Sequence, residues 1–301
     1  RPSGRQGGQA MNVPLQHYLL FDGVLHEQLL PWLYQRNEDL EIEPLYTGTA
    51  WAELAEIGPV LVKPFSASGL LADIEHESSL QTCASILHGR ASMPKVARHL
   101  RQFIQVRDSL GSNSLLRFAD PLVAQYWLGS YGTEELSSLL GPIDQWRLRA
   151  HCPRWQAREQ TPWLTFDSRE HTGMALSLCP ILLGEPQIQA LDQAYQQRFL
   201  DRLDAWCEQA HTSSRVAHGA HWSSWLHRQL QAAVAWGLTS ERSIAAWLDL
   251  HIHLGDDAFM SSDGPYAGWI ANNPQARTMS SDARIQAFEA DNLTDQQKGF
   301  S

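Results

Sequence analysis

A short apolar run near the start of the chain limits what this sequence can fold into. Residues 18–21 read Tyr-Leu-Leu-Phe and are followed directly by Asp22 and Gly23. Four apolar residues that end in an Asp-Gly pair are typical of a buried strand that stops at a turn. The next apolar residues, at positions 25, 29, 32 and 33, have the spacing of one helical face. The chain is therefore predicted to open with a strand, a turn and a helix, with Asp22 at the end of the strand.

Short apolar segments alternate with helical patterns as far as about residue 150. The predicted strands are residues 42–46, 60–64, 79–88 and 115–120, and the predicted helices are residues 49–57, 70–75 and 94–106. Within residues 136–149, Gly141 and Pro142 are expected to end one more helix. Strands that alternate with helices are typical of βαβ units, so we predict an α/β or α+β lobe with a mixed, mainly parallel sheet and flanking helices.

The second half of the chain changes to a helical period from residue 185 onward. Apolar residues at positions 188, 191, 194, 195, 199, 203 and 206 share one helical face, and two more helices are predicted around residues 222–236 and 244–254. A chain of 301 residues exceeds what one compact core usually holds. We therefore predict a disordered arm or cloning remnant at residues 1–14, the sheet lobe at 15–150, a connecting segment at 151–186, an all-helical lobe at 187–290 and a frayed tail at 291–301.

Charge and composition exclude several classes of protein. The formal net charge is -10 and Lys and Arg form no basic run, which argues against nucleic-acid binding. No apolar stretch approaches the roughly 20 residues that a membrane-spanning helix needs, and the first ten residues lack the apolar core of a signal peptide. The four cysteines, at positions 83, 152, 179 and 207, form no C-x-x-C pair and are expected to be free thiols. A cytoplasmic protein is the expected result.

Histidines suggest two metal sites, and both have a simpler interpretation. His251 and His253 precede Asp256 and Asp257, and imidazole with carboxylate suits zinc or iron. On a helix, however, positions 251 and 253 point about 200° apart, and Gly255 is better explained as the residue that ends the helix. A second group, His211, His218, His221 and His227, has no acidic residue between its members and is expected to be solvated or capping. No metal and no cofactor is predicted.

Arg117 lies inside the apolar segment 115–118 and needs a partner. If this segment is an inner strand, Arg117 points away from Leu116 and Phe118 and requires a carboxylate nearby. Asp22 and Asp120, each at a predicted strand end, are the expected partners. A structural ion-pair cluster is the favoured interpretation, and an anion or substrate site is the alternative. The chain has no G-x-S-x-G elbow, no P-loop and no Cys-His pattern, so no catalytic residues are predicted.

Six of the twelve tryptophans lie between residues 206 and 269. A core of the helical lobe is their default place. Trp222, Trp225, Leu226 and Trp236 nevertheless supply more large side chains than a small three-helix core easily packs. The alternative is therefore a surface groove, formed by these residues, that binds an apolar segment of another protein.

Five sequence blocks together resemble a known family. Residues 18–23, 44–49, 58–62, 116–121 and 141–143 read YLLFDG, PLYTGT, GPVLV, LRFADP and GPI. They occur in the order seen in the adaptor chaperones of bacterial type VI secretion, the Tap or TEC proteins, whose defining domain was long catalogued as one of unknown function. The resemblance covers about residues 15–150 and continues more loosely through residues 187–203 and 237–242.

The resemblance implies a function without catalysis. Such a protein would bind a toxic effector in the cytosol, keep it soluble and help load it onto the VgrG spike, often with a PAAR-type cap at the tip. Two alternatives remain open from the residues: an enzyme that uses Asp22, Arg117 and Asp120 on a small anionic substrate, and an immunity protein that blocks a toxin.

Overall fold

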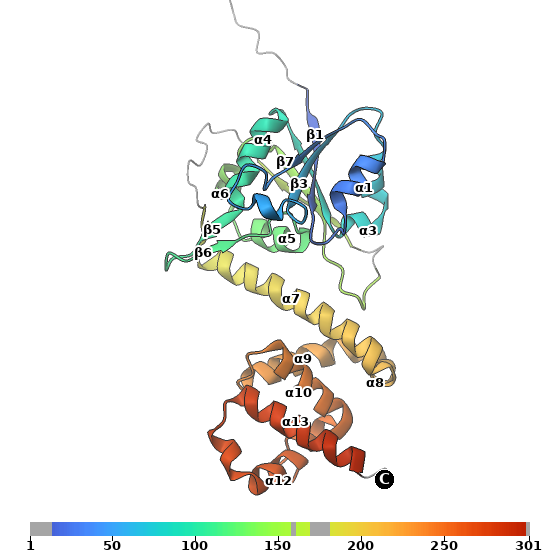
Figure 1. The fold of residues 1–301 in the computed structure, drawn as a ribbon, viewed down its shortest axis with the longest axis vertical. Helices are drawn as coiled ribbons and strands as arrows, with labels where there is room; N and C mark the ends of the chain where they lie inside the picture. The colour runs from blue at the N-terminus through green and yellow to red at the C-terminus, as the bar shows by residue number, and fades with distance from the viewer. Residues whose placement is uncertain (1–13, 158–160, 169–180, 299–301) are drawn as a thin grey trace, which may run out of the picture. The chain divides into compact units, whose positions relative to one another are not determined.

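The chain divides into two compact units. The computed structural model describes residues 14–157, 161–168 and 181–298 of the chain. The sheet unit comprises residues 1–152 and 156–195, and the helical unit comprises residues 153–155 and 196–301 (Figure 1). Most of the predicted arm, Cys179 and the last three residues lie outside the described residues.

The sheet unit is built on a sheet in which the opening strand is central. Among the described residues the order is β2-β3-β1-β4-β7-β8. Strand β1 (Gln16–Asp22) lies between β3 (Pro59–Pro64) and β4 (Ala84–Gly89). The outer strands are β2 (Leu40–Pro44), β7 (Gln145–Arg149) and β8 (Trp163–Asp167). The strand and turn predicted at residues 18–23 are confirmed.

The predicted direction of the strands is wrong. Every strand pair of this sheet is antiparallel. A parallel pair needs a crossover of a dozen or more residues, usually through a helix. The helix predicted at 49–57 is only a single 3-10 turn, η1 (Ala52–Leu54), and β2 and β3 pair directly as antiparallel neighbours. The segment between β2 and β3 is therefore not a crossover, because it leads directly to the neighbouring antiparallel strand.

A second, smaller sheet replaces two other predicted elements. It has the order β6-β5-β9, with β5 (Gln105–Arg107), β6 (Asn113–Leu115) and β9 (Ile181–Leu182). The helix predicted at 94–106 is α4 (Met93–Leu100), which is followed by the 3-10 turn η2 (Arg101–Phe103) and then β5. The strand predicted at 115–120 ends at Leu115, so Arg117 lies beyond it and not on an inner strand.

Helices cover both faces of the large sheet (Figure 1). They are α1 (Leu29–Gln35), α2 (Leu70–His76), α3 (Ser78–Gln81), α4, α5 (Pro121–Gly129) and α6 (Thr133–Leu140). Side chains alternate along β1, so Leu19 and Phe21 join the core under α1 to α3, while Tyr18 and Leu20 join the core with Trp127 of α5. Burial on both faces explains why β1 reads as an unbroken apolar run.

The helical unit confirms the prediction of an all-helical second half. Its helices are the C-terminal part of α7 (Glu185–Ala210), α8 (Thr212–His218), α9 (Trp222–Ala235), α10 (Glu241–Leu254), α11 (Asp256–Phe259), α12 (Pro265–Asn272) and α13 (Ser281–Lys298), with 3-10 turns η4 (Gly219–His221) and η5 (Pro274–Thr278). The tail predicted to fray at 291 remains helical as far as Lys298. Within the described ranges, no helix is both long enough and apolar enough to cross a membrane.

Gly23 gives a test of how closely the turn after β1 packs. A Cβ atom at Gly23 would lie 2.5 Å from the carbonyl oxygen of Gly58 and 2.9 Å from the carbonyl carbon of Ile57. Both are backbone atoms, so we expect Gly23→Ala to lower the free energy of unfolding by about 1–3 kcal/mol. Chemical unfolding, with amide exchange of β1 to separate the two units, measures the change.

Gly69 is the matched control because a Cβ atom there meets nothing within 4 Å. Its φ of -83° suits any residue, so Gly69→Ala should leave the stability unchanged or raise it by about 0.4–1 kcal/mol. Equal stabilities for the two variants would show that the turn does not pack as the structure describes.

Candidate functional site

The three predicted polar residues meet at the end of β1. Arg117 Nη2 lies 2.9 Å from Asp22 Oδ1 and 3.4 Å from Asp120 Oδ2. Asp22 also accepts hydrogen bonds from the backbone N–H groups of Val24 and Leu25, at 2.9 and 3.1 Å. Asp120 begins α5 by accepting the Leu122 N–H at 3.0 Å. Each carboxylate therefore closes a turn or starts a helix, and Arg117 joins the two.

Desolvation dominates the electrostatics of this polar cluster. Asp22 and Asp120 are buried, whereas the Arg117 side chain is 37% exposed. Burial raises the pKa of Asp22, Arg117 opposes that rise, and the nearby Asp120 carboxylate adds to it. Burial raises the pKa of Asp22 more than the ion pair with Arg117 lowers it. Arg117 therefore stabilises the fold most when the Asp22 carboxyl is ionised.

The space beside the polar cluster is too small for a metabolite. The cavity lined by Asp22, Tyr46, Pro59 and Arg117 holds about 20 Å³. A cavity of that size admits about one water molecule, whereas ligand sites usually measure roughly 300–1,000 Å³. The geometry therefore favours the structural interpretation of the cluster over the substrate site.

A larger depression lies near α3 and also lacks an activated nucleophile. Its volume is about 580 Å³, and its lining includes His26, Ser79 and Cys83. Burial raises the pKa of the Cys83 thiol to about 12. A thiol with so high a pKa is protonated at neutral pH and unreactive.

The aromatic residues predicted to form a groove lie mostly in the helical core. Trp222, Trp225 and Leu226 are buried. The two indole rings stack with centroids 5.1 Å apart. Their N–H groups donate to Asp204 at 2.7 Å and to Asp256 at 2.6 Å. Helices α11 to α13 enlarge the core beyond three helices and leave room for these rings. The structure therefore places these three residues in the core, which was their default place by sequence, and not on an exposed groove.

Trp236 is the exception among the four. It is partly buried, packs against the helical core, and carries the Arg284 guanidinium 4.9 Å above its ring. A cation over an indole face is stabilising and leaves that face covered.

The histidines before Gly255 separate as the helical geometry requires. His251 contacts Asp256 at 3.2 Å, whereas His253 lies 3.4 Å from Asp249 Oδ1. Gly255 ends α10 with φ 88° and donates its N–H to the His251 carbonyl at 3.0 Å, which confirms the predicted cap. The structure does not bring His251 and His253 to one point.

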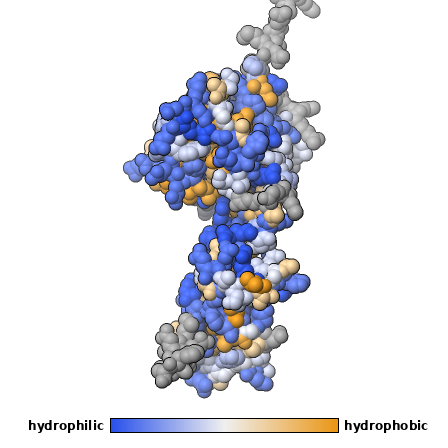
Figure 2. All heavy atoms as spheres, turned by 90° about the vertical axis from the view of Figure 1, so that its right-hand side faces the viewer, coloured by the Kyte–Doolittle hydropathy of each residue, from blue (hydrophilic) through white to orange (hydrophobic). Residues whose placement is uncertain are grey.

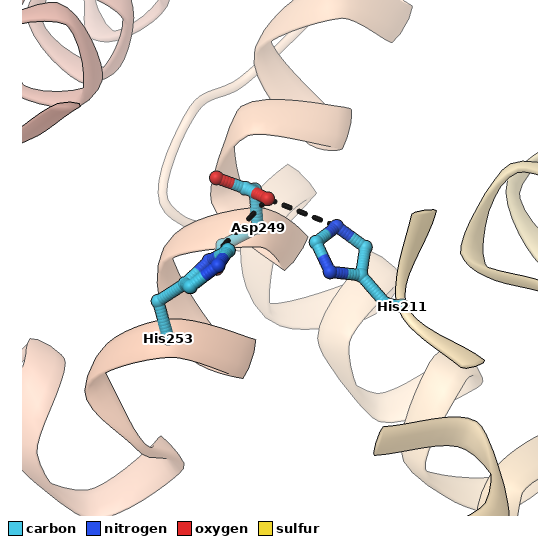
Figure 3. Close-up of side chains that lie close together, drawn as sticks. All are labelled: His211, Asp249 and His253. Atoms are coloured by element: carbon cyan, nitrogen blue, oxygen red, sulfur yellow. Dashed lines mark hydrogen bonds and ion pairs between the residues drawn. The ribbon is translucent and has the colours of Figure 1, made fainter. Parts of the chain in front are cut away.

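A different set of residues does meet, as Figure 3 shows. His211, which directly follows α7, places Nε2 2.9 Å from Asp249 Oδ1, and His253 lies on the other side of the same carboxylate. We call His211, Asp249 and His253 the histidine cluster. Burial lowers the pKa of His211 although Asp249 opposes the shift, so its imidazole favours the neutral form.

Part of the histidine cluster has a signal in the sequence. Asp249 and His253 are four residues apart, so they lie on one face of α10. His211 lies near neither of them in sequence, and only the packing of α10 beside the α7–α8 turn brings it there.

This chain is similar to one protein family over part of its length and to one curated protein over most of its length. Residues 17–138 match the family model described as "Domain of unknown function (DUF4123)". The curated "Accessory protein VasW" of Vibrio cholerae serotype O1 (strain ATCC 39315 / El Tor Inaba N16961) is 25% identical over 281 residues, which cover 92% of this chain and 88% of that protein. No solved structure matches the chain.

Arg117→Ala tests the structural interpretation of the polar cluster. The variant leaves two buried carboxylates without their cation, so we expect a loss of about 1–3 kcal/mol in the free energy of unfolding at neutral pH. The pKa of Asp22 is raised in the fold, so its contribution to stability is present at acid pH and lost as the pH rises through that raised pKa. The loss caused by Arg117→Ala should therefore shrink when the pH is lowered into the carboxyl range.

Arg90→Ala is the control for a surface ion pair. Arg90 lies 3.0 Å from Asp144, but its side chain is 58% exposed. Removing it should cost less than about 1 kcal/mol. An Arg117→Ala loss that is equally small and does not change with pH would rule out the buried-cluster interpretation.

Proposed function

Because this chain contains a DUF4123 domain, the domain that defines the type VI adaptor family, we propose that it is a cytoplasmic, non-enzymatic adaptor that binds a secretion effector. It would keep the effector soluble and help load it onto the VgrG spike, with a PAAR-type tip as a further partner. The match over residues 17–138 carries the proposal. Support comes from the similarity to an accessory protein over 92% of the chain, which reaches well into the helical unit.

The described side chains suit a protein that works by contact. The polar cluster is occupied with turn and helix formation, and its cavity holds about 20 Å³. An effector segment that is apolar on its own must be shielded in the cell and released later. A surface of moderate affinity fits that task better than an obligate interface.

Apolar side chains for such contact are present on the surface of the sheet unit. Figure 2 shows apolar patches, in orange, on a largely hydrophilic surface. Leu115 of β6 and Leu182 of β9 pair with Gln105 and Arg107 of β5, so all four point to one face of the small sheet. Leu182 is 63% exposed, and Leu110 in the β5–β6 turn is 90% exposed. We call Leu115 and Leu182, together with Leu110 in the adjoining turn, the leucine face. We propose that the effector binds there.

Co-expression tests the adaptor role directly. We expect the effector encoded beside this gene to be more soluble with the chain than without it and to co-purify with it, together with its VgrG. An effector from an unrelated secretion locus is the specificity control. The proposal fails if neither protein co-purifies and the effector is equally soluble alone.

Charge on the leucine face should break the complex. Leu110→Asp combined with Leu182→Asp places two carboxylates on the proposed apolar contact, and we expect at least about tenfold weaker effector binding because buried charge is costly at an interface. Val216→Asp is the matched control, since Val216 is 73% exposed on α8 of the helical unit. If only Val216→Asp weakens the complex, the effector binds the helical unit.

The same assay separates the remaining alternatives. An immunity protein would abolish the activity of the bound toxin and would need no VgrG. An enzyme acting through Asp22, Arg117 and Asp120 would lose turnover of a small anionic substrate in a folded Arg117→Lys variant. Effector binding would be unaffected in that variant.

A further inference from the structure

The histidine cluster has the donors and spacing of a metal centre. One nitrogen or oxygen atom from each of His211, Asp249 and His253 lies within 4.8 Å of the others. Tetrahedral zinc binds imidazole nitrogen at about 2.0–2.1 Å, which places neighbouring donor atoms about 3.4 Å apart. Asp249 Oδ1 lies 2.9 Å from His211 Nε2, close to that spacing. His253 Nδ1 lies 3.4 Å from Asp249 Oδ1 but contacts the Asp249 backbone carbonyl oxygen, so His253 would bind an ion through its Nε2 atom.

His211 supplies a second, independent observation. Its side chain is 9% exposed, and the Trp206 ring packs edge-on against it with centroids 4.9 Å apart. Its Nε2 atom is buried and lies 2.9 Å from Asp249 Oδ1. An ion between these two atoms would be bound by both of them.

His253 and Asp249 are positioned in the manner of metal ligands. His253 Nδ1 lies 2.9 Å from the Asp249 backbone carbonyl oxygen, a contact that orients the ring. Metal-bound imidazoles usually have such a contact to their other nitrogen. The His253 side chain is 43% exposed, so an ion can enter from solvent.

We propose that His211, Asp249 and His253 bind one divalent transition-metal ion of the zinc class, with a fourth position open to water. Two imidazoles and one carboxylate match the ligands of zinc and its neighbours in the first transition row. Magnesium and calcium prefer sites made of oxygen ligands alone. The ion would tie α10 to the turn between α7 and α8, within the helical unit.

Metal titration of the full chain tests the site. The protein is prepared without an affinity tag, freed of metal with a chelator and titrated with Zn²⁺ against a chromophoric competitor. We expect one ion per chain. His253→Ala and Asp249→Asn should each weaken binding at least about tenfold, because each removes one donor. A chain that binds no ion at stoichiometric Zn²⁺ would overturn the site.

His221→Ala is the matched control. His221 is an exposed histidine in η4, and its loss should leave zinc affinity unchanged. Circular dichroism confirms that each variant is folded, and His253→Ala is the more secure variant because its ring is largely at the surface. If His253→Ala and Asp249→Asn bind zinc as the wild type does, the ion lies elsewhere and the assignment is wrong.

Cobalt gives a separate readout of the ligands. Co²⁺ bound at the histidine cluster should show the visible bands of nitrogen and oxygen ligands. An intense near-ultraviolet thiolate band would instead assign the ion to a cysteine, which would exclude this site.

Discussion

The sheet unit depends on one constraint: strand β1 is covered on both faces and paired with a neighbouring strand along each edge. The strand pairs with β3 on one side and β4 on the other, while its side chains alternate between two cores. Such a position pairs the backbone of residues 19–21 on both sides and keeps the apolar side chains away from water. Where the strand ends, the backbone N–H groups of the following turn therefore need hydrogen-bond partners close by. Asp22 meets this need by accepting two backbone N–H groups of the following turn.

The polar cluster follows from that constraint. A carboxylate at the end of a buried strand has lost its solvation, and burial raises the pKa of Asp22 even beside a cation. Arg117 lowers the cost of keeping Asp22 ionised and also contacts Asp120, and its partly exposed side chain still reaches water. The same three residues thus link the turn after β1 to the start of α5. This link explains their presence without a substrate.

The two units differ in the apolar surface that they offer to a partner. The sheet unit contains the matched domain and an exposed leucine face on its small sheet. The helical unit buries Trp222, Trp225 and Trp247 and packs its other tryptophans, which are partly buried, against the same core, so its aromatic surplus contributes to its own stability first. The histidine cluster is the part of the helical unit whose chemistry is not explained by packing. If it holds an ion, the metal would support the scaffold, and the partner contact would remain a separate surface.

Sequence alone determined what depends on neighbours along the chain. The apolar run of β1, the helical second half and the Gly255 cap each have a local pattern, and the family resemblance is confirmed by the domain match. Asp22, Arg117 and Asp120 could be paired in advance because a cation within an apolar segment requires carboxylates and few were near strand ends, although Arg117 proved to be partly exposed and to lie beyond the strand. The direction of the strands, the core role of Trp222 and Trp225, and the meeting of His211 with Asp249 were decided only by the tertiary structure. Periodicity along a chain reports which side of an element is buried, but it carries no information on which distant element covers that side.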